Sequence, residues 1–146
     1  MKTSARNQFA GTVKAVEIGP VSAQVTIALA GGGETGGEIT ATLTSAAAKR
    51  LKLKKGREAL ALVKASAVVL VTDFAGWQLS ARNQLAGTVS RIERGAVSSL
   101  VVVTLPGGAA ITASVTNEGV EALGLAVGTP ATAVFKGYAV MVATQG

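Results

Sequence analysis

The alternation of hydrophobic and polar positions predicts a chain made mostly of β-strands. Two runs, residues 9–18 and 21–29, mix β-branched with polar residues on either side of a Gly-Pro turn, which predicts a hairpin. A glycine-rich loop over 31–37 comes next. Similar patterns predict three further strands, over 38–43, 58–64 and 67–71.

One segment in this half of the chain predicts a short helix instead. Residues 45–53 (SAAAKRLKL) can be capped at their start by Thr44 or Ser45, and Gly56 lies just past their end. Five strands and one short helix within about 70 residues fit a small OB-like Greek-key barrel.

The chain then repeats itself. Residues 4–8 (SARNQ) recur as residues 80–84, an offset of 76 (80 − 4). Beyond the glycine loop the offset falls to 72 (111 − 39), because the first copy is four residues longer there. We therefore predict an all-β protein of two tandem OB-like five-stranded Greek-key barrels, each with one short helix. The predicted domains are 1–72 and 77–146, with a linker at about 73–76.

The composition excludes most catalytic chemistry. The 146 residues include no Cys and no His, so there is no thiolate nucleophile, no disulfide, no Ser-His-Asp triad and no zinc site of the usual ligands. Aromatic residues make up only 3% of the chain, so burial depends on Val, Ala, Leu and Ile. We expect a protein that is not an enzyme and that has neither a cofactor nor a directly coordinated metal.

The formal net charge of +6 is concentrated in the first copy. Residues 1–73 hold ten Lys and Arg against five acidic residues, whereas residues 74–146 hold four against three. Five cations lie on or beside the predicted helix: Lys49, Arg50, Lys52, Lys54 and Lys55. We interpret them as a solubilising face rather than a nucleic-acid patch.

Neither the start of the chain nor its longest uncharged stretch predicts a membrane segment. The first residues, MKTSARNQ, have no continuous apolar run behind their basic residues, which argues against a secretory signal and favours a cytoplasmic location. Residues 95–117 carry no charge, but Pro106, two glycines and several hydroxyl residues divide them into two strand-like runs. We expect no membrane partner.

A set of hydrogen-bond donors recurs in both copies. The first set is Ser4, Arg6, Thr44 and Lys64, and the second is Ser80, Arg82, Thr116 and Lys136. No carboxylate recurs beside them. A site with donors only suits a fully deprotonated oxyanion, because Arg offers a planar fork, Lys a point charge and the hydroxyls further donors. Such a site rejects hydrogenphosphate, whose own proton would face another donor.

Each of these residues also has an ordinary structural interpretation. Ser4 can be a turn residue, Thr44 a helix cap, and Arg6 and Lys64 solvated surface cations. Their joint recurrence favours the oxyanion site, because exposed positions without a function tolerate many substitutes. Asn7 and Gln8 recur too, and hydrogen bonding to the backbone explains them as well as ligand contact does.

Residues 4–13 and 80–89 share the sequence Ser-Ala-Arg-Asn-Gln-hydrophobic-x-Gly-x-Val. It resembles the signature of the Mop or TOBE domain of molybdate-binding proteins, and a chain of two such copies resembles the di-domain molbindins. The resemblance covers nearly all 146 residues. It implies an OB-like barrel per copy, a homotrimer that forms a pseudo-hexamer of Mop domains, and molybdate or tungstate bound at domain and subunit interfaces.

The same resemblance implies a ligand set: the Ser and Arg of the signature, the Thr before the helix, and the Lys with the following backbone N–H. Carried onto this chain, the set is Ser4, Arg6, Thr44, Lys64 and Ala65, then Ser80, Arg82, Thr116, Lys136 and Gly137. A further hydroxyl that the family can place in the first helical turn is missing, because those positions are Ala47 and Gly119. We expect a site to pool Ser and Arg of one domain with Lys and Thr of another, since a buried dianion needs many donors.

The resulting hypothesis is a cytoplasmic molybdate- or tungstate-binding protein for storage or homeostasis. One alternative is an OB-type nucleic-acid-binding module, but its stacking surface needs aromatic side chains. We therefore expect no nucleic-acid partner, because the chain has only five aromatic residues: Phe9, Phe74, Trp77, Phe135 and Tyr138. A ligand-sensing regulatory domain of a molybdate transport system is the other alternative. The sequence contains no Walker motif and no helix-turn-helix, which favours storage.

Overall fold

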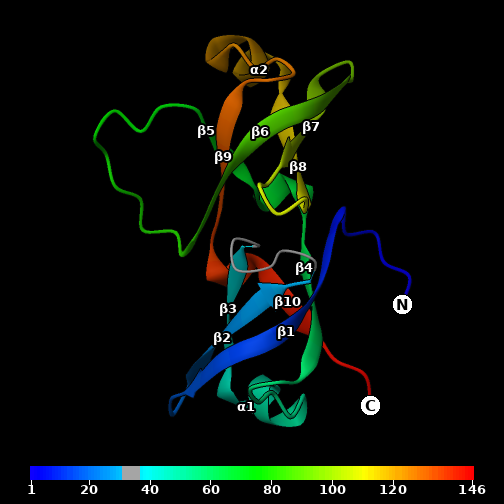
Figure 1. Ribbon diagram of the computed structural model, residues 1–146, viewed down its shortest axis with the longest axis vertical. Helices are drawn as coiled ribbons and strands as arrows, with labels where there is room; N and C mark the ends of the chain where they lie inside the picture. Colours follow the sequence, from blue (N-terminus) through cyan, green and yellow to red (C-terminus); the bar gives the residue numbers. More distant parts are fainter. Residues whose placement is uncertain (31–36) are drawn as a thin grey trace.

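The computed structural model describes residues 1–30 and 37–146, and it contains two five-stranded sheets, each curled into a small barrel (Figure 1). The predicted all-β class and the two tandem OB-like barrels are therefore confirmed. Neighbouring strands are antiparallel in both sheets. Most of the loop predicted over 31–37 lies outside the described residues.

The two sheets have equivalent strand orders. The first has the order β10-β4-β1-β2-β3 and consists of β1 (Asn7–Ile18), β2 (Ser22–Leu29), β3 (Glu38–Thr44), β4 (Glu58–Val63) and β10 (Val140–Ala143). The second has the order β5-β9-β6-β7-β8 and consists of β5 (Val69–Val71), β6 (Asn83–Arg94), β7 (Ser98–Thr104), β8 (Ala110–Thr116) and β9 (Pro130–Phe135). Each sheet thus contains four strands of one repeat and one strand of the other.

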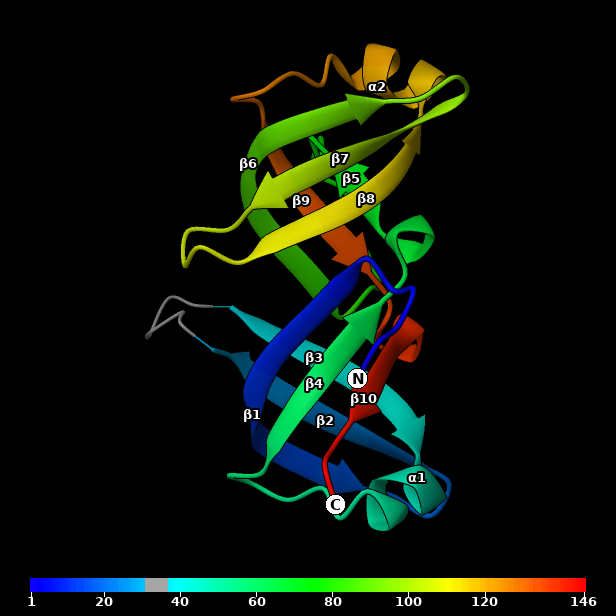
Figure 2. The same ribbon diagram turned by 90° about the vertical axis from the view of Figure 1, so that its right-hand side faces the viewer.

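The last strand of each repeat joins the other repeat's barrel (Figure 2). β5 pairs with β9, with Val69 opposite Val134, and β10 pairs with β4, with Val140 opposite Val63. Two single 3₁₀ turns, η2 (Ala65–Ala67) and η3 (Gly137–Ala139), carry the chain across the junction.

The expectation that the strand near 67–71 completes the barrel of its own copy is therefore wrong. The strands of the two repeats are similar, so the last strand of one repeat fits the equivalent position in the barrel of the other. This similarity permits the exchange. The division of the sequence into domains 1–72 and 77–146 stays a prediction, and it describes the sequence repeats. Each barrel also contains one strand from the other repeat.

Small branched side chains fill both barrels. Alternate residues of β2 and β3 point inward and are fully buried, including Val25, Ile27 and Ile39. The second barrel buries the equivalent residues of β7 and β8, Val101, Val103 and Ile111, to the same degree. This close packing without large aromatic side chains agrees with the low aromatic content of the chain.

Glycine is required where the long first strand of each barrel passes its hairpin partner. β1 has a register shift after Val13, and a Cβ atom on Gly11 would lie 2.4 Å from the carbonyl oxygen of Ala28. A Cβ atom on Gly87 would lie equally close, 2.4 Å from the carbonyl oxygen of Thr104. Because the obstructing atoms belong to the backbone, neither position has room for a side chain.

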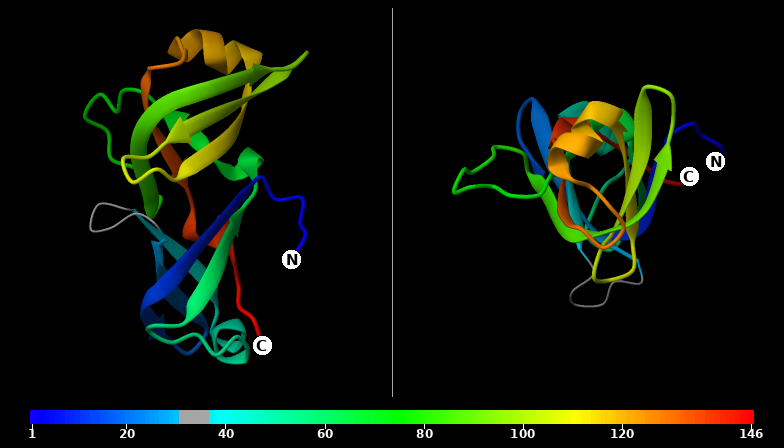
Figure 3. Two further views of the ribbon diagram at one scale, coloured as in Figure 1. Left: turned by 45° about the vertical axis from the view of Figure 1, so that its right-hand side comes forward. Right: turned by 90° about the horizontal axis from the view of Figure 1, so that it is seen from above.

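Two short helices lie at opposite ends of the elongated molecule (Figures 2 and 3). They are α1 (Ser45–Arg50) and α2 (Asn117–Leu123), and each follows the third strand of its barrel. The helix predicted over 45–53 is shorter than expected because Lys52 adopts a left-handed φ of 54°, which ends the helix at Arg50. The equivalent residue after α2 is Gly124, with a φ of 61°.

The strand exchange predicts that the two halves stay together after the connection between them is cut. Trp77 is 77% exposed in that connection, so we expect limited chymotrypsin treatment to cleave after it. Each fragment would still hold one strand of the other fragment's barrel. Size-exclusion chromatography in native buffer should then give one peak that contains both fragments, and denaturant should separate them. Separation in native buffer would contradict the exchange.

Candidate functional site

The cations of the predicted donor sets lie at the junction between the barrels. Arg6 directly precedes β1, Lys64 directly follows β4, and the adjacent ends of these two strands are paired, so the two cations leave the sheet at neighbouring positions. Arg82 and Lys136 have the same arrangement beside β6 and β9. Within one chain each arginine is therefore the neighbour of the lysine of its own domain, which differs from the expected pooling of Arg from one domain with Lys from another. All four are exposed, as are Ser4 and Ser80. None takes part in the ion pairs formed by the described residues, so the charges of these cations remain available.

A buried asparagine next to each arginine reaches across the junction. The side chain of Asn7 donates to the carbonyl oxygen of Thr112 at 2.8 Å and accepts from the backbone N–H of the same residue at 2.7 Å. Asn83 makes the same two hydrogen bonds with Thr40, both at 2.8 Å. The recurrence of this residue in SARNQ was the available signal, but the sequence could not identify its partner in the other barrel.

The glutamine of the motif has a local role. Gln8 donates to the carbonyl oxygen of Ala5 at 3.3 Å, and Gln84 donates to those of Ala81 and Leu79 at 3.0 and 3.2 Å. Both glutamines are exposed, and they brace the segment that carries the serine and the arginine.

Thr44 and Thr116 are the N-caps of the two helices. Each hydroxyl oxygen accepts a hydrogen bond of 3.1 Å, from the backbone N–H of Ala47 in the first barrel and of Gly119 in the second. A hydroxyl that accepts one bond keeps its own proton for another acceptor. Both threonines are exposed and can therefore still donate to a ligand.

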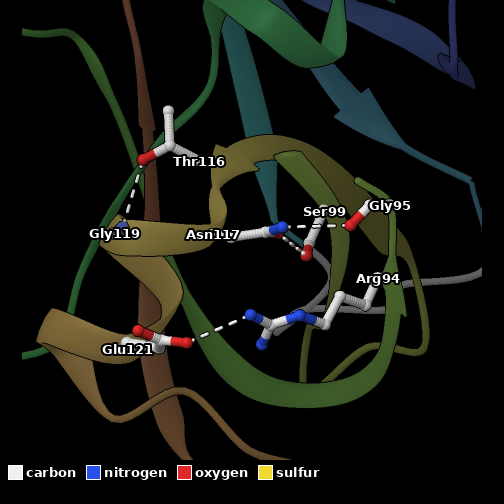
Figure 4. Close-up of polar contacts among 7 residues, drawn as sticks. All are labelled: Arg94, Gly95, Ser99, Thr116, Asn117, Gly119 and Glu121. Atoms are coloured by element: carbon white, nitrogen blue, oxygen red, sulfur yellow. Dashed lines mark hydrogen bonds and ion pairs between the residues drawn. The ribbon is translucent and has the colours of Figure 1, made fainter. Parts of the chain in front are cut away.

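Hydrogen bonds to the neighbouring hairpin hold both helix starts in place. In the second barrel Asn117 accepts from the hydroxyl of Ser99 at 2.6 Å and donates to the carbonyl oxygen of Gly95 at 3.0 Å (Figure 4). In the first barrel the Ser45 hydroxyl donates to the carbonyl oxygen of Gly19 at 2.6 Å. The position of each capping threonine is therefore fixed relative to its sheet.

A single chain does not bring the threonines to the cations. Asn83 contacts β3 at Thr40, and Thr44 lies four strand residues further along, a distance of about 13 Å. The spacing on β8 is the same. Figure 2 shows α1 and α2, the helices that these threonines cap, at the two ends of the molecule, whereas the arginines and lysines adjoin the strand ends at the junction. A site that uses all of these residues needs a second chain.

The two backbone positions of the predicted ligand set, Ala65 and Gly137, are buried at the junction. η3 lies so close to β3 that a Cβ atom on Gly137 would be 2.6 Å from the hydroxyl oxygen of Thr42. At the other junction, where η2 packs on β8, the equivalent residues are Ala65 and Ser114. The lysines that precede these turns are thereby held against the opposite barrel.

The ten residues of the predicted ligand set include four cations and no acidic residue. No group of three or more His, Cys, Asp or Glu residues that could hold a metal ion occurs in the described part of the chain. An open hollow on the first barrel, lined in part by Gly11, Arg57 and Thr144, includes none of the ten predicted ligand residues. No helix in residues 1–30 and 37–146 is long and apolar enough to span a membrane.

The fold and the repeated donors define a binding protein of two tandem barrels, and comparisons identify its family. Residues 3–70 and 79–142 each match the TOBE domain. The chain belongs to the TOBE-domain family and carries two tandem copies of the domain, so the resemblance found in the sequence is confirmed. TOBE domains are non-catalytic binding modules, which agrees with the prediction that the chain is not an enzyme.

The relatives include solved and curated proteins. A structure of the cytoplasmic molybdate-binding protein ModG with molybdate bound superposes with a TM-score of 0.93 and 47% identity, covering 99% of this chain and 100% of that chain. The molybdenum transport protein ModE of Herbaspirillum seropedicae is 68% identical over 99% of this chain. The molybdenum-pterin-binding protein MopA of Rhodobacter capsulatus is 39% identical over 98% of it. This chain spans about half, 52%, of each of these two proteins.

The close approach of η3 to β3 predicts that Gly137→Ala destabilises the protein by about 1–3 kcal/mol, because the new methyl group overlaps the hydroxyl of Thr42. Gly137→Ala combined with Thr42→Ala should recover part of this loss. Urea unfolding measures both effects, and Thr42→Ala alone is the control. If Gly137→Ala unfolds at the wild-type urea concentration, the close contact is absent in solution.

Proposed function

We propose that this chain binds molybdate, or tungstate, as a free dianion in the cytoplasm and that it stores or buffers it. The observation that carries the proposal is the pair of Arg–Lys clusters at the junction, which are exposed and make no ion pair within the described residues. The similarity to ModG, which was solved with molybdate bound, extends over almost the whole chain and supports the same conclusion.

The chemistry of the donors selects the ligand. Arg6 and Lys64 provide positive charge, Ser4 provides a hydroxyl, and the turn after the lysine provides a backbone N–H at Ala65. The second repeat provides Ser80, Arg82, Lys136 and Gly137. Molybdate and tungstate are fully deprotonated near neutral pH and accept at every oxygen, whereas hydrogenphosphate carries a proton for which these groups offer no carboxylate and only a serine hydroxyl oxygen as acceptor.

Thr44 and Thr116 complete the sites from another chain. Since each threonine is distant from the cations of its own chain, the proposal includes a homotrimer in which the helix end of one chain lies beside the junction of the next. A dianion bound between chains stabilises the assembly, because it binds the assembled chains and not the separate ones. The ligand and the oligomer therefore stabilise each other.

A regulatory role is the second candidate function. It is favoured by the identity of 68% to a ModE protein and by relatives named as ModE transcriptional regulators, of which this chain matches about half. In that role the two barrels would sense molybdate for an output domain. Nucleic-acid binding by the barrels themselves is less well supported, because Phe9 and Phe135 are buried and the exposed Trp77 and Tyr138 lie on separate segments.

The proposed chemistry predicts selectivity among tetrahedral oxyanions. Isothermal titration calorimetry at neutral pH should give submillimolar binding of molybdate, similar binding of tungstate, and much weaker binding of phosphate, which is the one of these three anions that carries a proton. Titrations at constant ionic strength separate this selectivity from general attraction of anions to a basic protein. Equal affinity for phosphate and molybdate would contradict the donor-only site.

Removal of the two arginines should abolish most of the binding. The double variant Arg6→Ala/Arg82→Ala loses the planar forks while the fold persists, because both side chains are exposed. The matched control is Arg91→Ala/Arg94→Ala, which removes the same charge from exposed positions of β6. Calorimetry should give wild-type stoichiometry for the control and little heat for the first variant. Retained stoichiometry in the first variant would show that the ligand set is wrong.

A further inference from the structure

The two buried asparagines at the junction act as substitutes for a neighbouring β-strand. β3 and β8 are the edge strands of their sheets, so backbone groups on one side of each have no partner in the ladder. Asn7 and Asn83 supply that partner at one residue of each strand, with four hydrogen bonds between 2.7 and 2.8 Å. Each asparagine is only 2% exposed.

Few side chains can make this pair of bonds. A primary amide carries one acceptor and a donor group at nearly the spacing of a peptide unit, whereas a carboxylate has no donor and a serine hydroxyl is too short to reach both backbone groups. Removal of Asn7 would leave the N–H and the C=O of Thr112 partly buried at the junction without a partner, which is unfavourable.

The barrels do not need the asparagines in order to stay together. The exchanged strands already join the two repeats, because β5 pairs with β9 at three residues and β10 pairs with β4 at four. The asparagine bonds add something different: they connect a particular point at the start of β1 to a particular point on β8, and the start of β6 to β3. They therefore fix the position of each barrel relative to the other at the junction.

That fixed point is next to the proposed ligands. Arg6 directly precedes Asn7, and the residue paired with Asn7, Val63, directly precedes Lys64. The hydrogen bonds to Thr112 thus hold the backbone of both cations against the second barrel. In the second repeat Asn83 holds Arg82 and Lys136 against the first barrel in the same way.

We propose that Asn7 and Asn83 are positioning residues for the oxyanion sites, each for the Arg–Lys pair of its own repeat. This inference rests on the proposed function. Each asparagine sets the separation of one arginine and one lysine from the facing edge strand, so that both reach the same dianion. Two classes of site follow from this, one that uses Arg6 and Lys64 and one that uses Arg82 and Lys136. Loss of one asparagine weakens the sites of its own repeat and leaves those of the other repeat unchanged.

The test uses the full chain with one class of site removed. In the Arg82→Ala background only the Arg6 sites remain. There, Asn7→Ala should weaken molybdate binding about tenfold or more, as the loss of a residue that orients ligand groups does at metal sites. Asn83→Ala in the same background should change the affinity by no more than about twofold, because it acts at the class of site already removed. Isothermal titration calorimetry measures both, well below the unfolding temperature of each variant.

Two further variants make the test specific. Gln8→Ala, also in the Arg82→Ala background, is the matched control from the same motif, since Gln8 is exposed and bonds only within its own segment. Asn7→Leu keeps nearly the volume of the side chain and loses both hydrogen bonds, so it separates the effect of the bonds from that of the cavity left by Asn7→Ala. In the Arg82→Ala background, Asn7→Leu should weaken the Arg6 sites about as much as Asn7→Ala does.

The outcomes separate this inference from the proposed function. If wild type and Arg82→Ala do not bind molybdate, the proposed function fails. If Arg82→Ala binds and Asn7→Ala leaves that affinity unchanged, the positioning role fails and the proposed function stands. Equal weakening by Asn7→Ala and Asn83→Ala in this background would also overturn the inference, because the asparagines would then hold the junction in general. Thermal unfolding of each variant confirms that it is folded, and Asn7→Leu tests the same bonds should Asn7→Ala not fold.

Discussion

The junction between the barrels depends on backbone pairing across the two repeats. A barrel of about 70 residues buries a modest core, and here neither barrel is completed by its own repeat. β5 and β10 each supply the missing strand to the other barrel, and the two asparagines add one more backbone-like pairing on the opposite edge. These contacts place the ends of β1, β4, β6 and β9 together, and the exposed cations next to those strand ends gather at the same place.

The chemistry of the junction follows from what gathers there. Arginine, lysine, a serine hydroxyl and the N–H after the lysine are all donors, and none of the four cations pairs with a carboxylate within the described residues. Burial of a dianion requires that its charge be balanced and its oxygens hydrogen-bonded. One chain offers only part of such a shell, because its threonines are at the far ends, and this incompleteness is the physical basis for proposing an assembly of chains.

The two repeats have diverged in pairs of neighbouring residues. The start of α2 has Asn117 with the buried hydroxyl of Ser99, whereas the start of α1 has Ser45, and Ala23 replaces the second hydroxyl. Such paired changes are expected where side chains pack closely, because a larger polar residue needs an added partner to satisfy it. The repeats therefore keep one backbone geometry with different local solutions.

By itself, the sequence determined the strand-rich class, the tandem repeat, the capped helix starts and the recurrent donors, because these depend on local periodicity and on residue type. The sequence also contained the recurrence of Asn7 and Asn83 but not its meaning, since their partners are 105 and 43 positions away in the chain. Only the tertiary structure decided which barrel receives each last strand, because two similar repeats offer equivalent places for it. It also decided that Arg6 and Lys64 are neighbours while Thr44 is remote, since the strands between them carry the chain from the junction to the end of the molecule.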